Sequence, residues 1–457
     1  MDVQGPDPGA TLSLNAIGKQ DTYLLNDDPR YSPFKYSYDR HSNFTKFHRS
    51  TTISKPNDAQ SNWPFGESIK VTLNPRNMGD LLSNMYISVK FPGLASGSFW
   101  LADQLGRHLI KSVVMRVDEL EVETYYDDWG IIYDQMYLDA SEKRTKRFLI
   151  NRNLAEDTSI LNHEGTDAEL DRADSDMLIP IPLFFSRKYE GDEYDSNKPN
   201  RPYFPTCAVH KQKIEFEIKF RPKTFFTNSN PEDITLNTFD LITEEMTVSD
   251  EERIFLSKRK QIFVTDMVKR HPVEETEVGS KVVRLQLVPN IPVKTLFWFL
   301  RDKDYEDETT SGGGTQLADQ AAANMHNRYN FSTTTLFNAT GTPIDTHNYP
   351  IIDSAKIFIN GEDLPNLPNV DHTYYKYVVP YNNRLSRTER NIYTYSFAMN
   401  PSNVEPSGSL DFSQLKSERT VLEINLKTGL TKTYVVNLYY VGYQTYTFEG
   451  GFMSLAY

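Results

Sequence analysis

The stretch Lys213-Ile-Glu-Phe-Glu-Ile-Lys-Phe220 decides the fold class, because apolar and charged residues alternate through it without interruption. A period of two is typical of a β-strand that turns one face to a core and the other to water. The same alternation occurs at Tyr86–Phe91 and at Val283–Leu287. These three runs therefore predict half-buried β-strands.

Two further alternating runs lie near the C-terminus, at Val421–Leu426 and Tyr434–Val441. The connection between them, Lys427-Thr-Gly-Leu-Thr-Lys432, contains a glycine. Alternating runs on both sides of a short glycine-containing connection are typical of a hairpin, and we interpret the pair in this way.

Helical patterns are short and few. The candidates are Tyr125–Leu138, Asp250–Phe263 and Thr315–Asn327. Helices do not alternate regularly with strands, as they would around a parallel sheet. We therefore predict an all-β protein in which a few short helices decorate β-sandwiches.

The composition agrees with a β protein. Hydrophobic residues make up only 38% of the chain, yet aromatic residues reach 12%, and aromatic rings fit a pleated, half-buried surface. A length of 457 residues leaves room for two or three domains. The 62 acidic and 49 basic side chains give a formal net charge of −13, which argues against wrapping of nucleic acid by Lys and Arg.

Several other classes are excluded. Cys207 is the only cysteine, so the chain can form neither an internal disulfide nor a multi-thiolate metal site. The N-terminal residues show no basic segment followed by an apolar one, and no stretch approaches the roughly 18 apolar residues of a membrane span. We expect a soluble protein that is made in the cytosol.

Long polar inserts interrupt the strand runs, and loops of such length are usually functional. One covers Asp139–Asp176 and continues through Tyr189–Pro202, and the other covers Arg301–Pro350. Their comparable positions in the two halves favour two similar sandwiches in tandem, with a polar junction near Arg221–Asp240. We expect a chain that lacks residues 301–350 to remain folded.

Motifs of common catalytic sites are absent from the sequence, including the nucleophile elbow, the HExxH zinc motif and the P-loop. The glycine run Gly312–Gly314 lacks a following lysine, and we interpret it as a flexible loop. The nine histidines include no His-x-His pair, so a metal site would have to be assembled across strands.

Acidic residues offer weak candidates for Ca²⁺, which takes carboxylate oxygens. They are the alternating Asp302, Asp304, Glu306 and Glu308, and the run Asp167–Asp176. A solvated, charged loop is the simpler interpretation of both segments.

Two further alternatives concern carbohydrate. The sequons at Asn43, Asn330 and Asn338 could carry glycans, but without a secretory signal we expect them to be unmodified. The aromatic excess leaves a carbohydrate-binding or carbohydrate-cleaving β-sandwich as the alternative function, although the spacing singles out no pair of carboxylates.

A longer stretch carries a resemblance to a known family: Asn391-Ile-Tyr-Thr-Tyr-Ser-Phe-Ala-Met-Asn-Pro-Ser-Asn-Val-Glu-Pro-Ser-Gly-Ser-Leu-Asp-Phe-Ser-Gln-Leu415. It closely resembles a signature of the major capsid proteins of nucleocytoplasmic large DNA viruses, a group that includes iridoviruses, phycodnaviruses and marseilleviruses. In that family a strand ending in Tyr-Ser-Phe leads into a proline-containing bend, Pro-Ser-Gly and an Asn-Phe-Ser turn. The matching residues are Tyr395, Ser396, Phe397, Pro406, Ser407, Gly408, Phe412 and Ser413.

The signature also has a physical logic. Pro406 fixes its own φ, and Gly408 permits backbone angles that most residues avoid, so the two residues predict a sharp corner between strands. Asp411 stands where the family usually has Asn, and Leu410 where it often has Cys. An Asn-specific or thiol role is therefore not expected here.

Five other blocks are similar to the family in the same order along the chain. They are Gln20–Leu24 with Pro33–Lys35 and Arg40–Phe44; Leu105–Val113 with Asp127-Asp128-Trp129; the acidic turn Asp250–Arg253, which opens the second domain; Ile359–Gly361, which precedes a Tyr-rich strand at Tyr374–Tyr377; and the ending Gly451–Tyr457. Together with the signature, these blocks extend the resemblance over nearly the whole chain.

The resemblance implies a fold and a domain organisation. The fold is two tandem eight-stranded jelly-roll sandwiches, a double jelly roll, with long loop inserts and few short helices. Residues 1–20 form an N-terminal arm, 21–225 the first jelly roll, 226–240 a linker and 241–457 the second jelly roll.

It also implies a structural function without catalytic residues, cofactor or metal. Three copies form a trimeric, pseudo-hexagonal capsomer that tiles an icosahedral shell over an inner membrane. The partners are neighbouring capsomers, minor capsid proteins and a penton protein, with no direct contact to nucleic acid. The protein is located in the outer capsid shell of the virion and assembles in the host cytoplasm. The acidic inserts 139–202 and 301–350 form outward towers, and the N-terminal arm lies toward the interior of the particle.

Overall fold

The computed structural model describes residues 8–19, 21, 41–53, 64–90, 104–150, 176–187, 203–222, 225, 238–306, 328–335, 344–367, 370–403 and 405–456. The chain divides into two compact units, residues 1–42 and 43–457. The first unit contains helix α1 (Pro8–Asn15), which falls within the predicted N-terminal arm. The sheets described below belong to the second unit.

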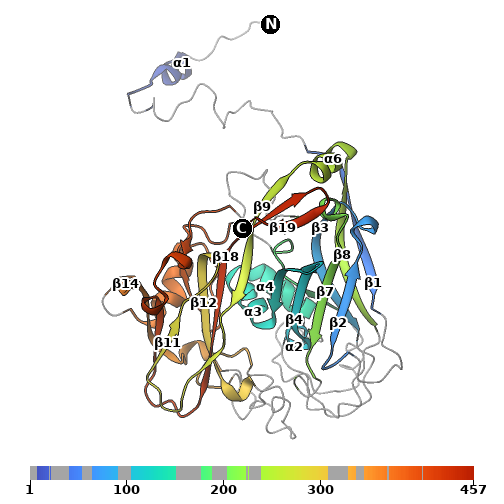
Figure 1. The fold of residues 1–457 in the computed structure, drawn as a ribbon. Helices are drawn as coiled ribbons and strands as arrows, with labels where there is room; N and C mark the ends of the chain where they lie inside the picture. Colours follow the sequence, from blue (N-terminus) through green and yellow to red (C-terminus); the bar gives the residue numbers. More distant parts are fainter. Residues whose placement is uncertain are drawn as a thin grey trace, which may run out of the picture. The chain divides into compact units, whose positions relative to one another are not determined.

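The first half of this second unit is a sandwich of two four-stranded antiparallel sheets (Figure 1). One sheet has the order β1 (Phe44–Thr52), β8 (Thr238–Val248), β3 (Leu81–Lys90) and β6 (Asp176–Pro180). The other has the order β2 (Ser68–Leu73), β7 (Ile214–Phe220), β4 (Ile110–Val117) and β5 (Leu120–Tyr126). The predicted strand at 213–220 is thus confirmed, and its four apolar side chains, Ile214, Phe216, Ile218 and Phe220, all lie in the core.

The second half is a sandwich of a four-stranded and a seven-stranded sheet. The smaller sheet has the order β11 (Val282–Gln286), β17 (Val421–Leu426), β13 (Ile352–Ile359) and β14 (Glu362–Leu364). The larger sheet contains β9 (Gln261–Arg270), β12 (Pro292–Asp302), β15 (Tyr393–Ser396) and β18 (Tyr434–Glu449), joined by the short strands β10 (Glu274–Glu275), β16 (Leu410–Asp411) and β19 (Phe452–Leu455). Both halves are jelly rolls. In the second half, the short strands β10, β16 and β19 are additional to the eight strands of a jelly roll.

Short helices connect and cover the strands. They are α2 (Leu105–Leu109), α3 (Asp127–Met136), α4 (Ala140–Ile150), α6 (Asp250–Lys258) and α8 (Val379–Asn382), with a π-helix at Tyr374–Val378 and 3₁₀ turns at Pro75–Asn77, Thr206–Val209, Lys303–Tyr305, Thr346–Asn348, Phe412–Gln414 and Ser417–Arg419. Two of the predicted helices are confirmed as α3 and α6, and the third, at 315–327, lies outside the described residues. In the part of the chain that is described, no helix is long and apolar enough to cross a membrane.

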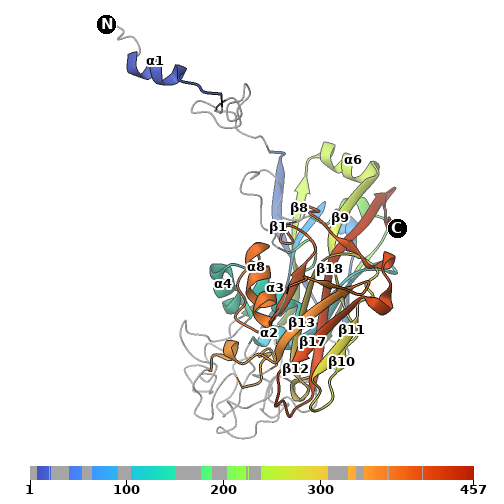
Figure 2. The same cartoon turned by 90° about the vertical axis from the view of Figure 1, so that its left-hand side faces the viewer.

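Two strands of the seven-stranded sheet, β12 and β18, are buried on both faces, and this explains how the two sandwiches hold together. In β12, Phe297 and Phe299 pack into the core of the first sandwich, whereas Leu296 and Trp298 pack into the core of the second. Strand β18 also packs side chains into both cores, and it runs between the two halves (Figures 1 and 2). A strand that is buried on both faces needs apolar residues at consecutive positions, as these two strands have.

The predicted domain boundary needs a correction. Strand β8 pairs with β1 and with β3, so it is the last strand of the first sandwich. The second jelly roll therefore does not begin at residue 241, which lies inside β8. Sequence alternation shows that a strand is half-buried, but it carries no information about the sheet that the strand joins.

The predicted C-terminal hairpin is wrong for the same reason. Strand β17 pairs with β11 and β13, whereas β18 pairs with β12 and β9 in the other sheet of the sandwich. The connection that contains Gly429 therefore crosses from one sheet to the other. Both strands exist at the predicted positions, but they do not pair with each other.

The Tyr-rich segment Tyr374–Tyr377 is also not a strand but part of the π-helix. Tyr375 packs edge-on against Trp298, with ring centroids 5.1 Å apart, and its hydroxyl donates to the carbonyl of Ala355 at 3.0 Å. These tertiary contacts outweigh the preference of tyrosine for strands, which itself mostly reflects packing.

Candidate functional site

The signature residues form a corner that follows β15. The Phe397 and Ala398 amides donate to the carbonyl of Lys294 at 2.8 and 3.3 Å, and the Ser396 hydroxyl donates to the carbonyl of Ala398 at 2.8 Å. Lys294 lies at a register shift between Val293 and Thr295 in the pairing of β12 with β18. The irregular pairing thus places the Lys294 carbonyl where the corner can bond to it.

Ser407 closes the loop of the corner. Its hydroxyl donates to the carbonyl of Asn400 at 3.1 Å and accepts from the Asn400 amide at 3.0 Å. The Ser407 amide donates to the hydroxyl of Tyr443 on β18 at 3.3 Å. One side chain therefore joins the two limbs of the loop, and its backbone ties the loop to the seven-stranded sheet.

Gly408 provides the sharp turn that the sequence predicts. Its φ is +138°, and a Cβ at this position would lie 3.0 Å from the Phe397 carbonyl oxygen. Both the backbone angle and the close approach favour glycine. Pro406, in contrast, is exposed.

Aromatic rings and one cap complete the corner. The Phe412 ring is buried edge-on against Phe397 at 5.8 Å, and Phe397 contacts Tyr395 at 5.2 Å. The Asp411 carboxylate accepts from the Ser413 amide at 2.9 Å and so caps the turn at Phe412–Gln414. Asp and Asn cap equally well, so the departure from the family pattern leaves the turn intact.

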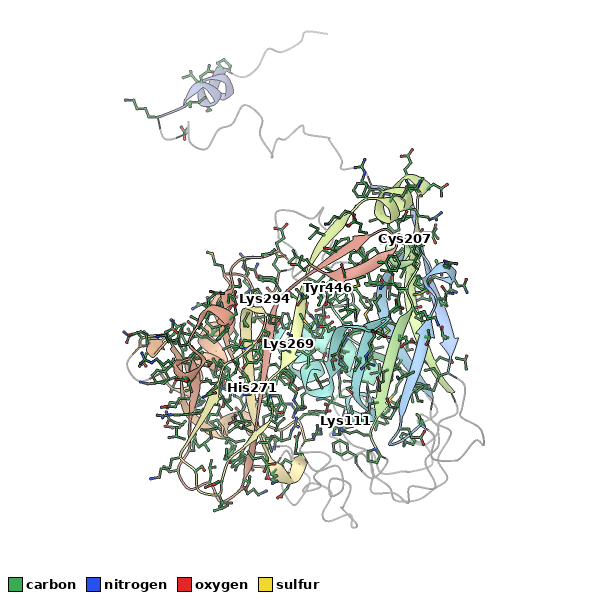
Figure 3. The ribbon with its side chains drawn as sticks, in the orientation of Figure 1. Lys111, Cys207, Lys269, His271, Lys294 and Tyr446 are labelled. Atoms are coloured by element: carbon green, nitrogen blue, oxygen red, sulfur yellow. The ribbon has the colours of Figure 1, made fainter. Side chains whose placement is uncertain are left out.

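Sequence reasoning missed a buried ion pair beneath the corner. The Lys294 ammonium lies 2.5 Å from the Asp266 carboxylate and 3.4 Å from the carbonyl of Asn403. Figure 3 labels Lys294. Burial lowers the pKa of Lys294, and the neighbouring Asp266 opposes that shift. A lysine within the apolar run of β12 was the available signal, because such a side chain is buried only with a partner.

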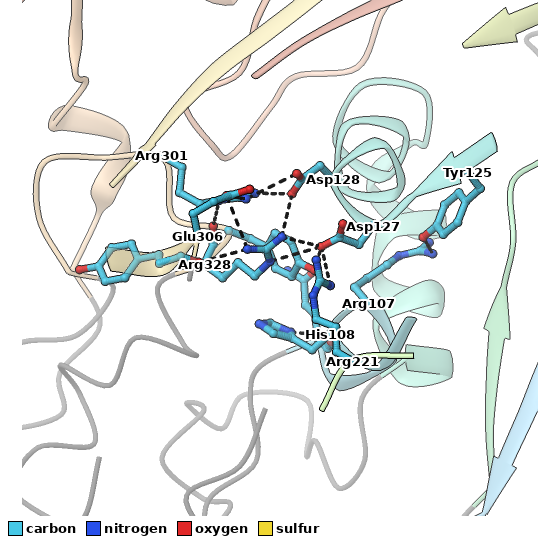
Figure 4. A network of polar contacts seen from close by, with 12 residues as sticks. Arg107, His108, Tyr125, Asp127, Asp128, Arg221, Arg301, Glu306 and Arg328 are labelled. Atoms are coloured by element: carbon cyan, nitrogen blue, oxygen red, sulfur yellow. Dashed lines mark hydrogen bonds and ion pairs between the residues drawn. The ribbon is translucent and has the colours of Figure 1, made fainter. Parts of the chain in front are cut away.

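A second buried cluster lies between the two sandwiches (Figure 4). Its carboxylates are Asp127 and Asp128 at the start of α3, and Glu306 after β12; its guanidinium groups belong to Arg221, Arg270, Arg301 and Arg328. Asp127, Asp128 and Arg221 come from the first sandwich, and the other four residues from the second. We call these seven residues the junction network.

Asp127 is the centre of the network. Its Oδ2 accepts from the Arg328 Nη2 at 3.1 Å and from the Tyr329 hydroxyl at 2.9 Å, and it forms an ion pair with Arg221 at 2.8 Å. Arg301, which is fully buried, bonds to both Asp128 and Glu306. Because buried charges need partners, the two sandwiches stabilise each other's charges.

The network shifts the ionisation of its members. Burial alone would raise the pKa of Asp127 and Glu306, but the neighbouring arginines outweigh it and lower both, the pKa of Glu306 to about 2. His108 packs edge-on against Tyr329, with ring centroids 4.7 Å apart, and its pKa is lowered as well, which for a base favours the neutral form. Burial, followed by Arg328 and Arg221, lowers the pKa of His108 to about 3, so the imidazole is neutral.

The candidate Ca²⁺ ligands do not converge. Asp302 and Asp304 both pair with Lys432, whereas Glu306 belongs to the junction network. Glu308 and residues 167–175 lie outside the described residues. Within the described ranges, no group of three or more His, Cys, Asp or Glu side chains could hold a metal ion.

The network also contradicts the expectation that residues 301–350 are dispensable. Arg301 is a buried partner of Asp128 and Arg328 is one of Asp127, so removal of this insert would take the hydrogen-bonded arginine from Asp128 and leave Asp127 with Arg221 alone. The insert as defined from sequence therefore includes part of the protein core.

The three sequons differ in their surroundings. Asn330 is buried; its amide nitrogen donates to the carbonyl of Thr334, and its oxygen accepts from Ser332 at 2.9 Å. A glycan at Asn330 would have to break these bonds. Asn43 is exposed at the start of the second unit, and Asn338 lies outside the described residues.

Comparison with known proteins extends over nearly the whole chain. A family model for the large eukaryotic DNA virus major capsid protein matches residues 251–448, and a model for the N-terminus of major capsid proteins matches residues 32–254. The chain is 23% identical to the major capsid protein of Paramecium bursaria Chlorella virus 1 over 433 residues, covering 92% of this chain and 88% of the relative. It is 23% identical to the major capsid protein of Phaeocystis pouchetii virus over 533 residues, covering 98% and 99%.

Solved structures share the fold. The PBCV-1 VP54 structure, fitted into a reconstruction of the virophage Sputnik, superposes with a TM-score of 0.69 at 20% identity and covers 93% of this chain and 99% of that one. The Faustovirus major capsid protein superposes with a TM-score of 0.62 at 10% identity, covering 94% of each chain. The boundary between the two family models, near residue 251, agrees with the end of β8.

Proposed function

Because the chain belongs to the family of major capsid proteins of large eukaryotic DNA viruses, we propose that three copies form a trimeric capsomer of pseudo-hexagonal outline. The protein is a structural component of the icosahedral virion shell and not an enzyme. Two sandwiches in each chain give six sandwiches around the threefold axis, and such cyclic contacts close without leaving a free interface.

One observation carries the proposal. The seven-stranded sheet contributes to both hydrophobic cores, and the junction network joins the same two halves through buried charges. The two sandwiches therefore behave as a single rigid block. A block of fixed shape is what a hexagonal tile requires, because independent movement of its halves would destroy the outline.

The remaining partners belong to the same proposal. Capsomers contact neighbouring capsomers, minor capsid proteins and a penton protein, and the shell surrounds an inner membrane and assembles in the host cytoplasm. Apart from the segments that pack in the core, such as β6 and the buried Arg301 and Arg328, the inserts at 139–202 and 301–350 form the outward face in this proposal and carry much of the acidic excess, which keeps free capsomers apart and makes assembly depend on salt. Residues 1–20 form an arm toward the interior, and contact with nucleic acid is left to other proteins.

The signature residues have a structural role in this proposal. The corner formed by Tyr395–Phe397, Pro406–Gly408 and Phe412–Ser413 fixes the path between β15 and β16 rather than performing chemistry. Support comes from the hydrogen bonds to Lys294 and from the backbone angle of Gly408.

Light scattering of the purified protein, combined with size exclusion, tests the assembly. We expect a mass of three chains that does not change on dilution in the micromolar range, and hexagonal particles in negative-stain images. Circular dichroism on the same fractions shows whether the protein is folded. A folded species with the mass of one chain at every concentration would contradict the trimer.

A further inference from the structure

Helix α6 connects β8 to β9 and lies at one end of the second unit (Figures 1 and 2). None of its nine residues is buried. One side of the helix is tied to the first sandwich, because the Arg253 guanidinium donates to both carboxylate oxygens of Asp80, at 2.7 and 3.0 Å. The opposite side of α6 is therefore the side that faces solvent.

The solvent side of the helix carries apolar as well as charged residues. Its exposed positions recur at helical spacing, and we call them the α6 face: Asp250, Glu251, Ile254, Phe255 and Lys258. The side chain of Ile254 is 50% exposed and that of Phe255 is 45% exposed. Neighbouring apolar side chains within a rim of charge are typical of an interaction surface rather than of a solvated helix.

The α6 face has a definite order along the helix. It is acidic at the start, apolar in the middle and basic at the end. Such an order is complementary to itself when a second copy of the helix lies antiparallel to the first. Glu251 of each helix then faces Lys258 of the other, and Ile254 of each faces Phe255 of the other, since both pairs share one centre. The antiparallel arrangement also places opposite ends of the two helix dipoles side by side.

The charges that this arrangement needs are available. Among the described residues, neither Glu251 nor Lys258 takes part in an ion pair, and both are exposed. Asp250 differs from them, because it already pairs with Arg253 within the helix at 2.9 Å. Glu251 and Lys258 are therefore the two charges of the α6 face that a second copy can engage.

We propose that the α6 face forms a twofold contact between two copies of this chain in neighbouring capsomers, which rests on the trimeric capsomer proposed above. A contact across a twofold axis uses the same surface on both partners, so that surface must be self-complementary. An icosahedral shell contains twofold axes, and some capsomers meet across them. Each contact is small, and its two ion pairs are exposed, so free capsomers associate weakly. In a closed shell many such contacts act together.

Sedimentation velocity of the purified protein over a concentration series, at low and at high sodium chloride, tests the proposal. We expect the smallest species to associate in pairs as its concentration rises, and sodium chloride to weaken the pairing. Glu251→Lys places two lysines opposite each other twice in every contact, and it should weaken the association about tenfold. The double variant Glu251→Lys/Lys258→Glu brings opposite charges together again and should recover the association.

The net charge of the chain makes this test specific. The chain has a formal net charge of −13, so replacing an acid by a lysine lowers the general repulsion between copies and would by itself favour association. Glu277→Lys makes the same change at an exposed position in the loop between β10 and β11, and it should not weaken the association. A loss that is confined to Glu251→Lys therefore reports the contact and not the net charge. Circular dichroism shows whether each variant is folded.

Several outcomes would overturn the proposal. They are a smallest species that never associates, a Glu251→Lys variant that associates at least as strongly as the wild type, and a folded double variant that does not recover. Binding of phosphatidylserine vesicles by a protein that does not self-associate would assign the α6 face to a lipid surface instead. The trimer is tested separately, because it determines the mass of the smallest species, whereas the α6 contact determines only how that species associates.

Discussion

The corner at residues 395–413 and the junction network are both held by buried or precisely placed polar groups, but their partners lie at very different distances along the chain. Within the corner, Ser396 bonds to Ala398 and Asp411 to Ser413, two residues away in each case, although the backbone ties to Lys294 and Tyr443 reach distant parts of the chain. In the junction, Asp127 and Arg328 are 201 residues apart. A local arrangement leaves a recognisable motif, whereas a distant one leaves only scattered charged residues.

The second difference concerns energy. The corner depends mainly on backbone hydrogen bonds and one glycine, and water could replace part of these bonds if the loop opened. Most charges of the junction, namely those of Asp127, Asp128, Arg221, Arg301 and Arg328, have almost no access to water, and loss of one partner leaves another charge buried with fewer partners. We therefore expect substitutions in the junction to destabilise the protein more than substitutions in the corner.

Deletion of the second insert gives the largest expected effect. A chain without residues 301–350 should not fold, because it loses Arg301, Glu306 and Arg328 together. A chain in which only residues 308–326 are replaced by a short Gly/Ser linker should fold, since Arg328 donates to the carbonyl of Tyr305 at 3.1 Å and the two ends lie close together. Circular dichroism and the yield of soluble protein show whether each of the two deletion variants folds. Equal behaviour of the two deletions would contradict the role of the junction.

Removal of one buried carboxylate should have the next largest effect. Asp127→Ala leaves Arg221 and Arg328 without their shared partner, and we expect a loss of about 3–5 kcal/mol in the free energy of unfolding, measured with urea. The control is Asp363→Ala, which breaks a partly exposed pair with Lys356 and should cost less than about 1 kcal/mol. Similar losses of unfolding free energy in both variants would show that the buried charges of the junction contribute no more to stability than a partly exposed pair.

Acid should weaken the junction through His108. Its folded pKa of about 3 lies below the ordinary value of 6.5, so the unfolded chain takes up a proton that the folded protein does not. The stabilising contribution is complete above pH 6.5 and is lost as pH falls toward 3, by about 3 kcal/mol at pH 4. Urea unfolding from pH 7 to pH 4 should therefore show a smaller loss of stability in His108→Phe than in the wild type. Parallel pH curves would refute this assignment.

The corner can be tested with two glycines that share a positive φ. Gly408→Ala places a Cβ 3.0 Å from the Phe397 carbonyl oxygen, whereas a Cβ at Gly429 meets nothing within 4 Å. We expect losses of about 2–3 kcal/mol for Gly408→Ala and about 1 kcal/mol for Gly429→Ala in the free energy of unfolding. If the two variants lose the same amount, the backbone angle alone explains the glycine at 408.

The smallest effect is expected at the cap of the corner. Asp411→Asn keeps an oxygen that accepts from the Ser413 amide, and stability should change by less than about 0.5 kcal/mol. Asp411→Ala removes the acceptor and should cost about 1 kcal/mol. Thermal unfolding of both variants checks the order, and a larger loss with Asn than with Ala would contradict the capping role.

The sequence by itself determined much of this protein. Alternation located β7 and β11, short helical patterns located α3 and α6, and the signature located a corner that Gly408 and Ser407 do form. All of these features depend on residues that are close together in the chain, so their physical causes can be read from a short window.

Only the tertiary structure decided how these pieces combine. It placed β8 in the first sandwich, separated β17 from β18, turned Tyr374–Tyr377 into a π-helix and buried Arg301 and Arg328 at the junction. Strand pairing and charge pairing depend on which surfaces meet after folding, and many pairings are compatible with the same local pattern. The physical reason is that the burial of side chains decides which of these pairings forms, and burial depends on the packing of the whole molecule rather than on any single segment.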